Sequence, residues 1–173
     1  MEIFIPDVYA KSIYDIDYEK LKNRGIKCIL FDLDNTIAPK GVNEPDKKTI
    51  ELFEKIEDCG LKAILVSNSG KKRVTPFKEK LNIDAAHTAC KPLKNKYKKI
   101  LKIYKFKDNE IAAVGDQLLT DILGANRMGF TSILVNQMSS NDFNITKMNR
   151  VIERKIFAIL EKKGLFKIGE YYD

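Results

Sequence analysis

The sequence predicts an α/β fold in which helices cover both faces of a parallel sheet, in a three-layer, Rossmann-like arrangement. Short apolar runs rich in Ile, Leu and Val alternate with longer segments of helical periodicity. Continuous apolar runs of this length are typical of strands that are buried on both faces. Three runs are clear, a fourth is shorter and a fifth is weak: Lys27–Phe31, Lys62–Val66, Thr131–Val135, Ile111–Val114 and Ile83–Ala86.

Helical patterns fill the intervals between the predicted strands. The first long helix begins at Pro45-Asp46 and ends at Gly60, residues that favour helix starts and stops. A strand–helix–strand alternation produces right-handed crossovers in an open parallel sheet. The other expected helices are Tyr18–Asn23, Lys71–Leu81, Pro92–Phe106, Leu118–Met128 and Asn149–Lys163.

Composition argues against several protein classes. No apolar run approaches the roughly 18 residues that span a bilayer, and the N-terminus lacks the pattern of a signal peptide. Cys28, Cys59 and Cys90 form no CxxC pair, which argues against a disulfide framework or a zinc site and predicts a cytoplasmic protein. The net charge of +7 favours anionic partners: phosphorylated substrates, nucleic acid or acidic lipid surfaces.

Polar residues follow the predicted strands at the points where the strands end. In open parallel sheets the carboxyl ends of the strands form the ligand-binding edge. Residues from four separate segments therefore converge on one edge. The set consists of Asp32 and Asp34 after the first strand, Ser67 and Asn68 after the second, Lys91 before a helix, and Asp116 and Asp121 after the fourth strand.

The chemistry of this set favours phosphoryl transfer. Carboxylates brought close together raise one another's pKa, and a divalent cation relieves the repulsion. A site built from oxygen ligands suits Mg²⁺. Lys91, Ser67 and nearby backbone N–H groups can bind phosphoryl oxygens. One carboxylate can then attack phosphorus, while a second, two residues on, serves as general acid and base.

The same residues resemble the four motifs of the haloacid dehalogenase (HAD) superfamily, in that family's order, over roughly residues 25 to 136. The first motif reads DLDNT at 32–36 and the last reads GD…D at 115–121, with Ser67 and Lys91 between them. Further segments near 6–16, 115–129 and 149–154 resemble subclass IIIA phosphatases of the YqeG type, which are similar to mitochondrial phosphatidylglycerophosphate phosphatases.

The resemblance implies a role for each matching residue. Asp32 is the expected nucleophile, which forms an aspartyl-phosphate, and Asp34 is the expected general acid and base. Ser67 and Lys91, with Asn68 beside them, are expected to bind phosphate. The expected Mg²⁺ ligands are Asp32, the backbone carbonyl of Asp34, Asp116 and Asp121, the last as a ligand or as a partner of one.

The expected organisation is one HAD-like domain over residues 1–173. It has an N-terminal extension (1–24), a motif-bearing core (25–136) and a C-terminal helical extension (137–173). The gaps from Asp34 to Ser67 and from Ser67 to Lys91 are about 33 and 24 residues, enough for one helix–strand unit each and too short for a large cap domain. An open site suits a bulky or membrane-borne substrate.

Several functions remain open at this level. The resemblance favours a lipid head-group phosphate such as phosphatidylglycerophosphate, and the alternative is a soluble sugar phosphate or nucleotide. A receiver-like signalling module also uses clustered aspartates, but its phosphorylated Asp follows the acidic pair on a later strand. An RNA-binding module is disfavoured because the sequence has no aromatic-interleaved basic motif of the kind that stacks bases.

Two basic segments have two interpretations each. The stretch Lys91–Lys107 carries eight lysines and no acid, and its apolar residues Leu93, Tyr97, Ile100, Leu101 and Tyr104 share one predicted helical face. The lysines form either a solvated face or a reversible contact with an anionic membrane surface. The segment Arg150–Lys163 is also basic and amphipathic, and its apolar residues Val151, Phe157 and Leu160 either complete the core or face a partner.

Overall fold

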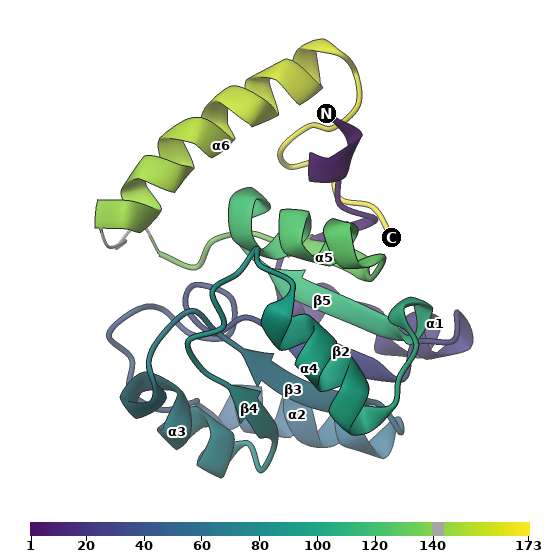
Figure 1. Cartoon of the computed structure of the whole chain (residues 1–173), viewed down its shortest axis with the longest axis vertical. Helices are drawn as coiled ribbons and strands as arrows, with labels where there is room; N and C mark the ends of the chain where they lie inside the picture. Colours follow the sequence, from purple (N-terminus) through teal and green to yellow (C-terminus); the bar gives the residue numbers. More distant parts are fainter. Residues whose placement is uncertain (140–143) are drawn as a thin grey trace.

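A six-stranded parallel sheet forms the centre of the computed structural model (Figure 1). The structure describes the backbone of residues 1–139 and 144–173 and the side chains of residues 1–139 and 148–173. The strand order is β1-β6-β5-β2-β3-β4. The strands are β1 (Val8–Ala10), β2 (Cys28–Phe31), β3 (Lys62–Val66), β4 (Asp84–Ala86), β5 (Ile111–Gly115) and β6 (Thr131–Val135).

Helices cover both faces of this sheet, as the alternation of elements predicts. The residues of the central strands alternate in direction, so that Ile29 and Phe31 face one cluster while Cys28 and Leu30 face another. Helices α1, α2 and α3 pack on the first face, and α4, α5 and α6 pack on the second. The helices are α1 (Tyr18–Asn23), α2 (Lys47–Asp58), α3 (Lys71–Lys80), α4 (Asn95–Tyr104), α5 (Leu123–Met128) and α6 (Asn144–Lys162).

All five predicted strands are present, and the structure adds a sixth. Strand β1 pairs in parallel with β6 at the edge of the sheet, and it was missed because three residues give no usable periodicity. The backbones of Tyr9 and Tyr172 exchange two hydrogen bonds of 2.8 and 3.0 Å on the outer side of β1. The chain segments near residues 9 and 172 therefore meet at this edge.

Three predicted helices differ from those observed, and the last of them, expected from Asn149, begins at Asn144 instead. The helix expected from Pro92 begins at Asn95 instead, because the backbone N–H of Leu93 donates a 2.9 Å hydrogen bond to the carbonyl of Cys90 and so closes a turn ahead of the helix. Leu93 consequently does not join the core face and is 54% exposed. The helix expected over 118–128 begins with the π-helical turn η4 (Leu118–Ile122) and continues as α5. Single π-helical turns occur often at functional sites.

Helix α6 completes the core with one face only. Leu160 is fully buried and Phe157 is partly buried, and both pack in a cluster that includes Tyr9 and Phe166. Val151 is 49% exposed and lies outside this cluster. The predicted C-terminal extension contains residues 140–143, which lie outside the described part of the chain. Among the described helices, none combines the length and the apolar character that crossing a bilayer requires.

Candidate functional site

The strand order places the candidate site at the carboxyl ends of β2 and β5. From β2 the chain builds outward through β3 to β4, then returns to the other side of β2 with β5 and continues to β6. The connections after β2 and β5 therefore diverge to opposite sides, and this topological switch is where parallel sheets bind ligands. Asp32 follows β2 and Asp116 follows β5 at this point.

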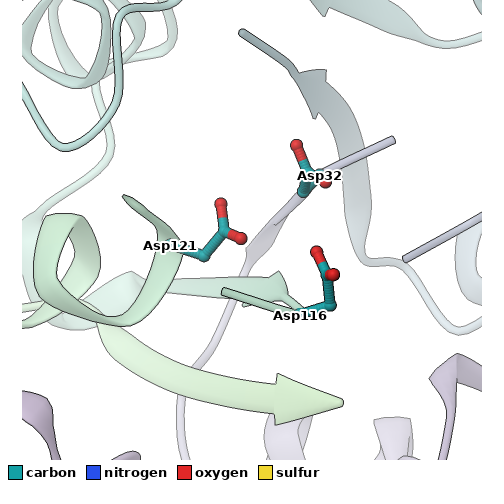
Figure 2. Close-up of side chains that lie close together, drawn as sticks. All are labelled: Asp32, Asp116 and Asp121. Carbon is teal, nitrogen blue, oxygen red and sulfur yellow. The ribbon is translucent and has the colours of Figure 1, made fainter. Parts of the chain in front are cut away.

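Three carboxylates meet there. Asp32, Asp116 and Asp121 each offer an oxygen atom within 4.8 Å of the others, and all three side chains are buried. Figure 2 shows Asp32 and Asp116 beyond the ends of two strands and Asp121 on the helical turn η4. Burial raises the pKa of Asp32 to about 6. The positive charge of Lys91 lowers this pKa, and the negative charge of Asp121 raises it again. Burial also raises the pKa of Asp116 well above its usual value.

Lys91 lies between two of these carboxylates. Its Nζ donates hydrogen bonds of 2.6 Å to Asp32 Oδ1 and to Asp121 Oδ1. Burial alone would lower the pKa of Lys91, but the two carboxylates outweigh it and raise the pKa. The side chain of Asn68 accepts a 2.7 Å hydrogen bond from the backbone N–H of Lys91 and donates one of 3.2 Å to its carbonyl. Asn68 therefore fixes the backbone from which Lys91 extends.

Asp34 stands apart from the buried carboxylate cluster. Its Oδ1 accepts a 3.0 Å charge-assisted hydrogen bond from Arg73 Nε, and its Oδ2 accepts one from the Ser69 hydroxyl. Ser67, two residues before Ser69, is buried, and its Oγ accepts a 3.1 Å hydrogen bond from the backbone N–H of Ser69. Sequence reasoning missed Ser69 and Arg73, and only the position of Ser69 next to Ser67-Asn68 could have indicated it.

Helix α6 supplies two further residues that sequence reasoning did not assign. Arg150 donates hydrogen bonds to the carboxylate of Asp116 and, over 2.7 Å, to its carbonyl oxygen. Glu153 accepts a 2.9 Å hydrogen bond from Arg150 and a 3.0 Å bond from the backbone N–H of Leu119. The sequence offered one signal for these two residues: an arginine and a glutamate lie three positions apart, on the helix face that also carries Leu160. The hydrogen bonds of Arg150 and Glu153 therefore hold α6 against the segment that carries Asp116 and Asp121.

The donor set fits a divalent cation. One oxygen of each of two carboxylates is bound by a cation: Lys91 contacts Asp32 Oδ1, and Arg150 contacts Asp116 Oδ2. The other two oxygens, Asp32 Oδ2 and Asp116 Oδ1, each lie 3.3 Å from the Thr36 hydroxyl. The site contains five carboxylates and three cationic side chains, so its net charge is −2 when all of them are ionised. These groups are Asp32, Asp34, Asp116, Asp121 and Glu153, with Lys91, Arg73 and Arg150. Carboxylate oxygens are the ligands that Mg²⁺ prefers.

An open cavity of about 590 Å³ lies in front of these residues. Asp32, Asp34, Ser67 and Lys91 line it, and Asn149 of α6 contributes to its rim. Between Asp34 and Lys91 the chain contains only α2, β3, α3 and β4, so neither expected cap position holds a cap domain. The predicted site residues thus share one cavity or the buried cluster at its floor, and a substrate reaches them from solvent.

Comparison with known proteins identifies the family. The sequence profile of the family described as mitochondrial PGP phosphatase matches residues 1–138. The chain belongs to this PGP phosphatase family. It is 39% identical to the probable phosphatase YqeG of Bacillus subtilis, over 94% of this chain and 95% of that protein. It is 27% identical to the phosphatidylglycerophosphate phosphatase 1 of Arabidopsis thaliana, over 95% of this chain and 50% of that protein.

Solved phosphatase structures share the fold of this member of the PGP phosphatase family. A cobalt-bound deoxy-D-mannose-octulosonate 8-phosphate phosphatase from Haemophilus influenzae superposes with a TM-score of 0.55 at 12% identity, over 77% of this chain and 90% of that one. A D,D-heptose 1,7-bisphosphate phosphatase from B. bronchiseptica gives 0.53 at 14% identity, over 75% and 99%. The chain is a phosphatase with the HAD fold, as the motifs indicate.

Gly115 provides a test of the packing at the site. A Cβ atom at this position would lie 2.2 Å from Asp121 Cγ, which is closer than two non-bonded atoms can approach. We expect Gly115→Ala to displace Asp121, to cost about 1–3 kcal/mol of stability and to reduce turnover at least about tenfold. The control is the wild-type chain, measured under the same conditions. Urea unfolding and a phosphatase assay measure both effects, and unchanged turnover in Gly115→Ala would contradict the packing argument.

A thermal-shift measurement tests the cation site without relying on activity. An ion that binds only the folded chain, at 100 times its Kd, should raise the Tm by roughly 5–10 °C relative to chelator. Asp116→Asn should lose most of this shift, since it removes a charge from the converging oxygens. KCl at matched ionic strength is the control. Equal Tm values in Mg²⁺ and in chelator would contradict the fit.

Proposed function

We propose that this phosphatase hydrolyses phosphate monoesters with Mg²⁺ through an aspartyl-phosphate on Asp32, and that its substrate is a lipid head-group phosphate, namely that of phosphatidylglycerophosphate. One observation supports the mechanism above all. The Asp32 carboxylate lies at the floor of an open cavity, held by Lys91 and facing Asp116 and Asp121. The substrate proposal is supported by the family and by the names of its relatives in Arabidopsis thaliana and Chlamydomonas reinhardtii.

Asp32 acts as the nucleophile in this proposal. Its carboxylate oxygen forms a bond to phosphorus as the bond from phosphorus to the head-group oxygen breaks. Lys91 holds one oxygen of Asp32 and so sets the direction of the other. With a pKa of about 6, Asp32 is mostly ionised at neutral pH. Bound Mg²⁺ would be held by Asp32, Asp116 and Asp121 and would offset the charge of the phosphate.

Asp34 acts as general acid and then as general base. It protonates the departing head-group oxygen, then removes a proton from the water that attacks the phosphoryl group and regenerates Asp32. Arg73 and the Ser69 hydroxyl hold the Asp34 carboxylate in one orientation at the cavity wall. Their hydrogen bonds limit the side-chain rotation that would misdirect the proton.

Ser67 and Lys91 bind the remaining phosphoryl oxygens in this proposal, and both line the cavity. Asn68 lines it as well, but both polar groups of its side chain contact the backbone of Lys91. We therefore propose that Asn68 acts mainly by positioning Lys91, and its direct phosphate contact stays a prediction. The receiver-like and RNA-binding alternatives are not favoured, because the chain belongs to a phosphatase family.

Substitution of the two catalytic aspartates tests the mechanism. Asp32→Asn should abolish turnover with the fold retained, since the amide is close in size but is not nucleophilic. Asp34→Asn should slow turnover by about 10²–10⁴-fold, the usual contribution of general acid–base catalysis, and should allow phosphorylated protein to accumulate. Mass spectrometry after a rapid acid quench detects the phosphoryl adduct. Substantial turnover in Asp32→Asn would show that the covalent route does not pass through this residue.

A substrate panel tests the lipid proposal independently. With Mg²⁺ present, phosphatidylglycerophosphate in detergent micelles should give a higher kcat/KM than sugar phosphates, nucleotides or a chromogenic aryl phosphate. Excess chelator should abolish turnover of every ester in the panel. A preference for a soluble sugar phosphate or nucleotide would move the assignment to that class and leave the mechanism intact.

A further inference from the structure

Helix α6 leaves an apolar stripe on its outer face. Met148, Val151, Ile152 and Ile159 are between 43% and 62% exposed. At 3.6 residues per turn these four positions share one side of the helix, opposite Glu153 and Leu160, which are buried. A helix that needed only to cover the sheet would carry polar residues on this side.

Basic residues surround this stripe. Arg154, Lys155, Lys162 and Lys163 are exposed, and Glu161 is the single exposed acid between residues 148 and 163. At about 100° per residue, Arg154 and Lys163 lie at the two edges of the stripe, while Lys155 and Lys162 project from among its apolar residues, where their long side chains can carry the charge past those residues to anionic groups. An apolar face flanked by Lys and Arg is typical of helices that lie in the interface of an anionic bilayer.

The stripe begins beside the catalytic cavity. Asn149 lines the cavity and Arg150 contacts Asp116, while Met148 and Val151 are their immediate neighbours in the chain. The inner face of the first described turns of α6 is thus part of the site, and the outer face is solvent-exposed. Figure 1 shows α6 as the outermost element at one end of the molecule.

We propose that the outer face of α6 docks this phosphatase onto an anionic lipid surface, with the stripe inserted between head groups. The proposal rests on the proposed lipid substrate for its purpose. Docking in this orientation would bring the rim of the cavity at Asn149 to the level of the head groups. A phosphorylated head group then reaches Asp32 without leaving the bilayer.

The lysines of α4 are the competing surface. Because α4 runs antiparallel to the strands, its start lies near the site and its end lies at the opposite edge of the sheet, roughly 15 Å away by helical rise. Lys98, Lys102 and Lys105 spread along that length, and Ile103 is the one large apolar side chain of α4 that is clearly exposed. Charge of this kind attracts the chain to acidic lipid but provides no apolar stripe for insertion.

Vesicle sedimentation tests the proposal on the full chain. The probe is vesicles of phosphatidylcholine and phosphatidylglycerol in equal parts, with pure phosphatidylcholine vesicles as reference. The stripe variant is Val151→Gln, Ile152→Gln and Ile159→Gln combined, and the matched control is Lys94→Gln, Lys98→Gln, Lys102→Gln and Lys105→Gln. We expect the stripe variant to lose anionic vesicle binding at least about tenfold, at low salt and at 0.5 M salt alike. The α4 variant should lose binding chiefly at low salt, where charge attraction is strongest.

Activity separates failure of docking from failure of the proposed function. The stripe variant should keep its Tm and its turnover of a chromogenic aryl phosphate, and it should lose turnover of phosphatidylglycerophosphate presented in vesicles. The same lipid dispersed in detergent should restore it. Equal vesicle binding by wild type and stripe variant would overturn the proposal, as would a wild-type chain that does not bind anionic vesicles. A wild-type dimer that the stripe substitutions dissociate, without vesicle binding, would assign the stripe to a second copy of the chain instead.

Discussion

Mutual repulsion among buried carboxylates is the constraint on which the rest of the site depends. The strand order brings Asp32 and Asp116 to one point, and η4 turns Asp121 toward them. Burial makes their charges costly unless cations accompany them. Lys91 reaches the cluster from the segment before α4, and Arg150 reaches it from α6. The docking of two helices from different parts of the chain is therefore tied to the electrostatics of a single point.

Most of this arrangement was accessible from the sequence, because it follows from local patterns and one general rule. Buried parallel strands are continuous apolar runs, so β2, β3, β5 and β6 were visible as segments rich in Ile, Leu and Val. Once the sheet is parallel, residues that follow its strands share an edge, and this placed Asp32 and Asp116 together. The absence of a cap between Asp34 and Lys91 followed from the number of residues available there.

The parts that were missed depend on tertiary contacts. Arg150 and Glu153 look like ordinary members of a basic amphipathic helix until α6 docks and buries them against Asp116 and Leu119. Arg73 is one of many cations in α3, and only the fold brings it to Asp34. Asn68 was assigned by its neighbours, whereas its contacts with the backbone of Lys91 span 23 positions of the chain. Strand β1 is recognisable only by its pairing with β6.

The pairing between Tyr9 and Tyr172 has a consequence for behaviour in concentrated solution. An outermost strand presents unpaired N–H and C=O groups that invite strands from other molecules, and this begins many aggregation reactions. Here the Tyr9 backbone is already paired on its outer side with Tyr172, and the Tyr172 hydroxyl donates a 2.9 Å hydrogen bond to the carbonyl of Pro6. With three residues in β1 and that pairing in place, little of this edge remains for another chain to extend. The segment around Tyr171 and Tyr172 thus occupies the hydrogen-bonding groups of β1 that a strand of another molecule would need for pairing.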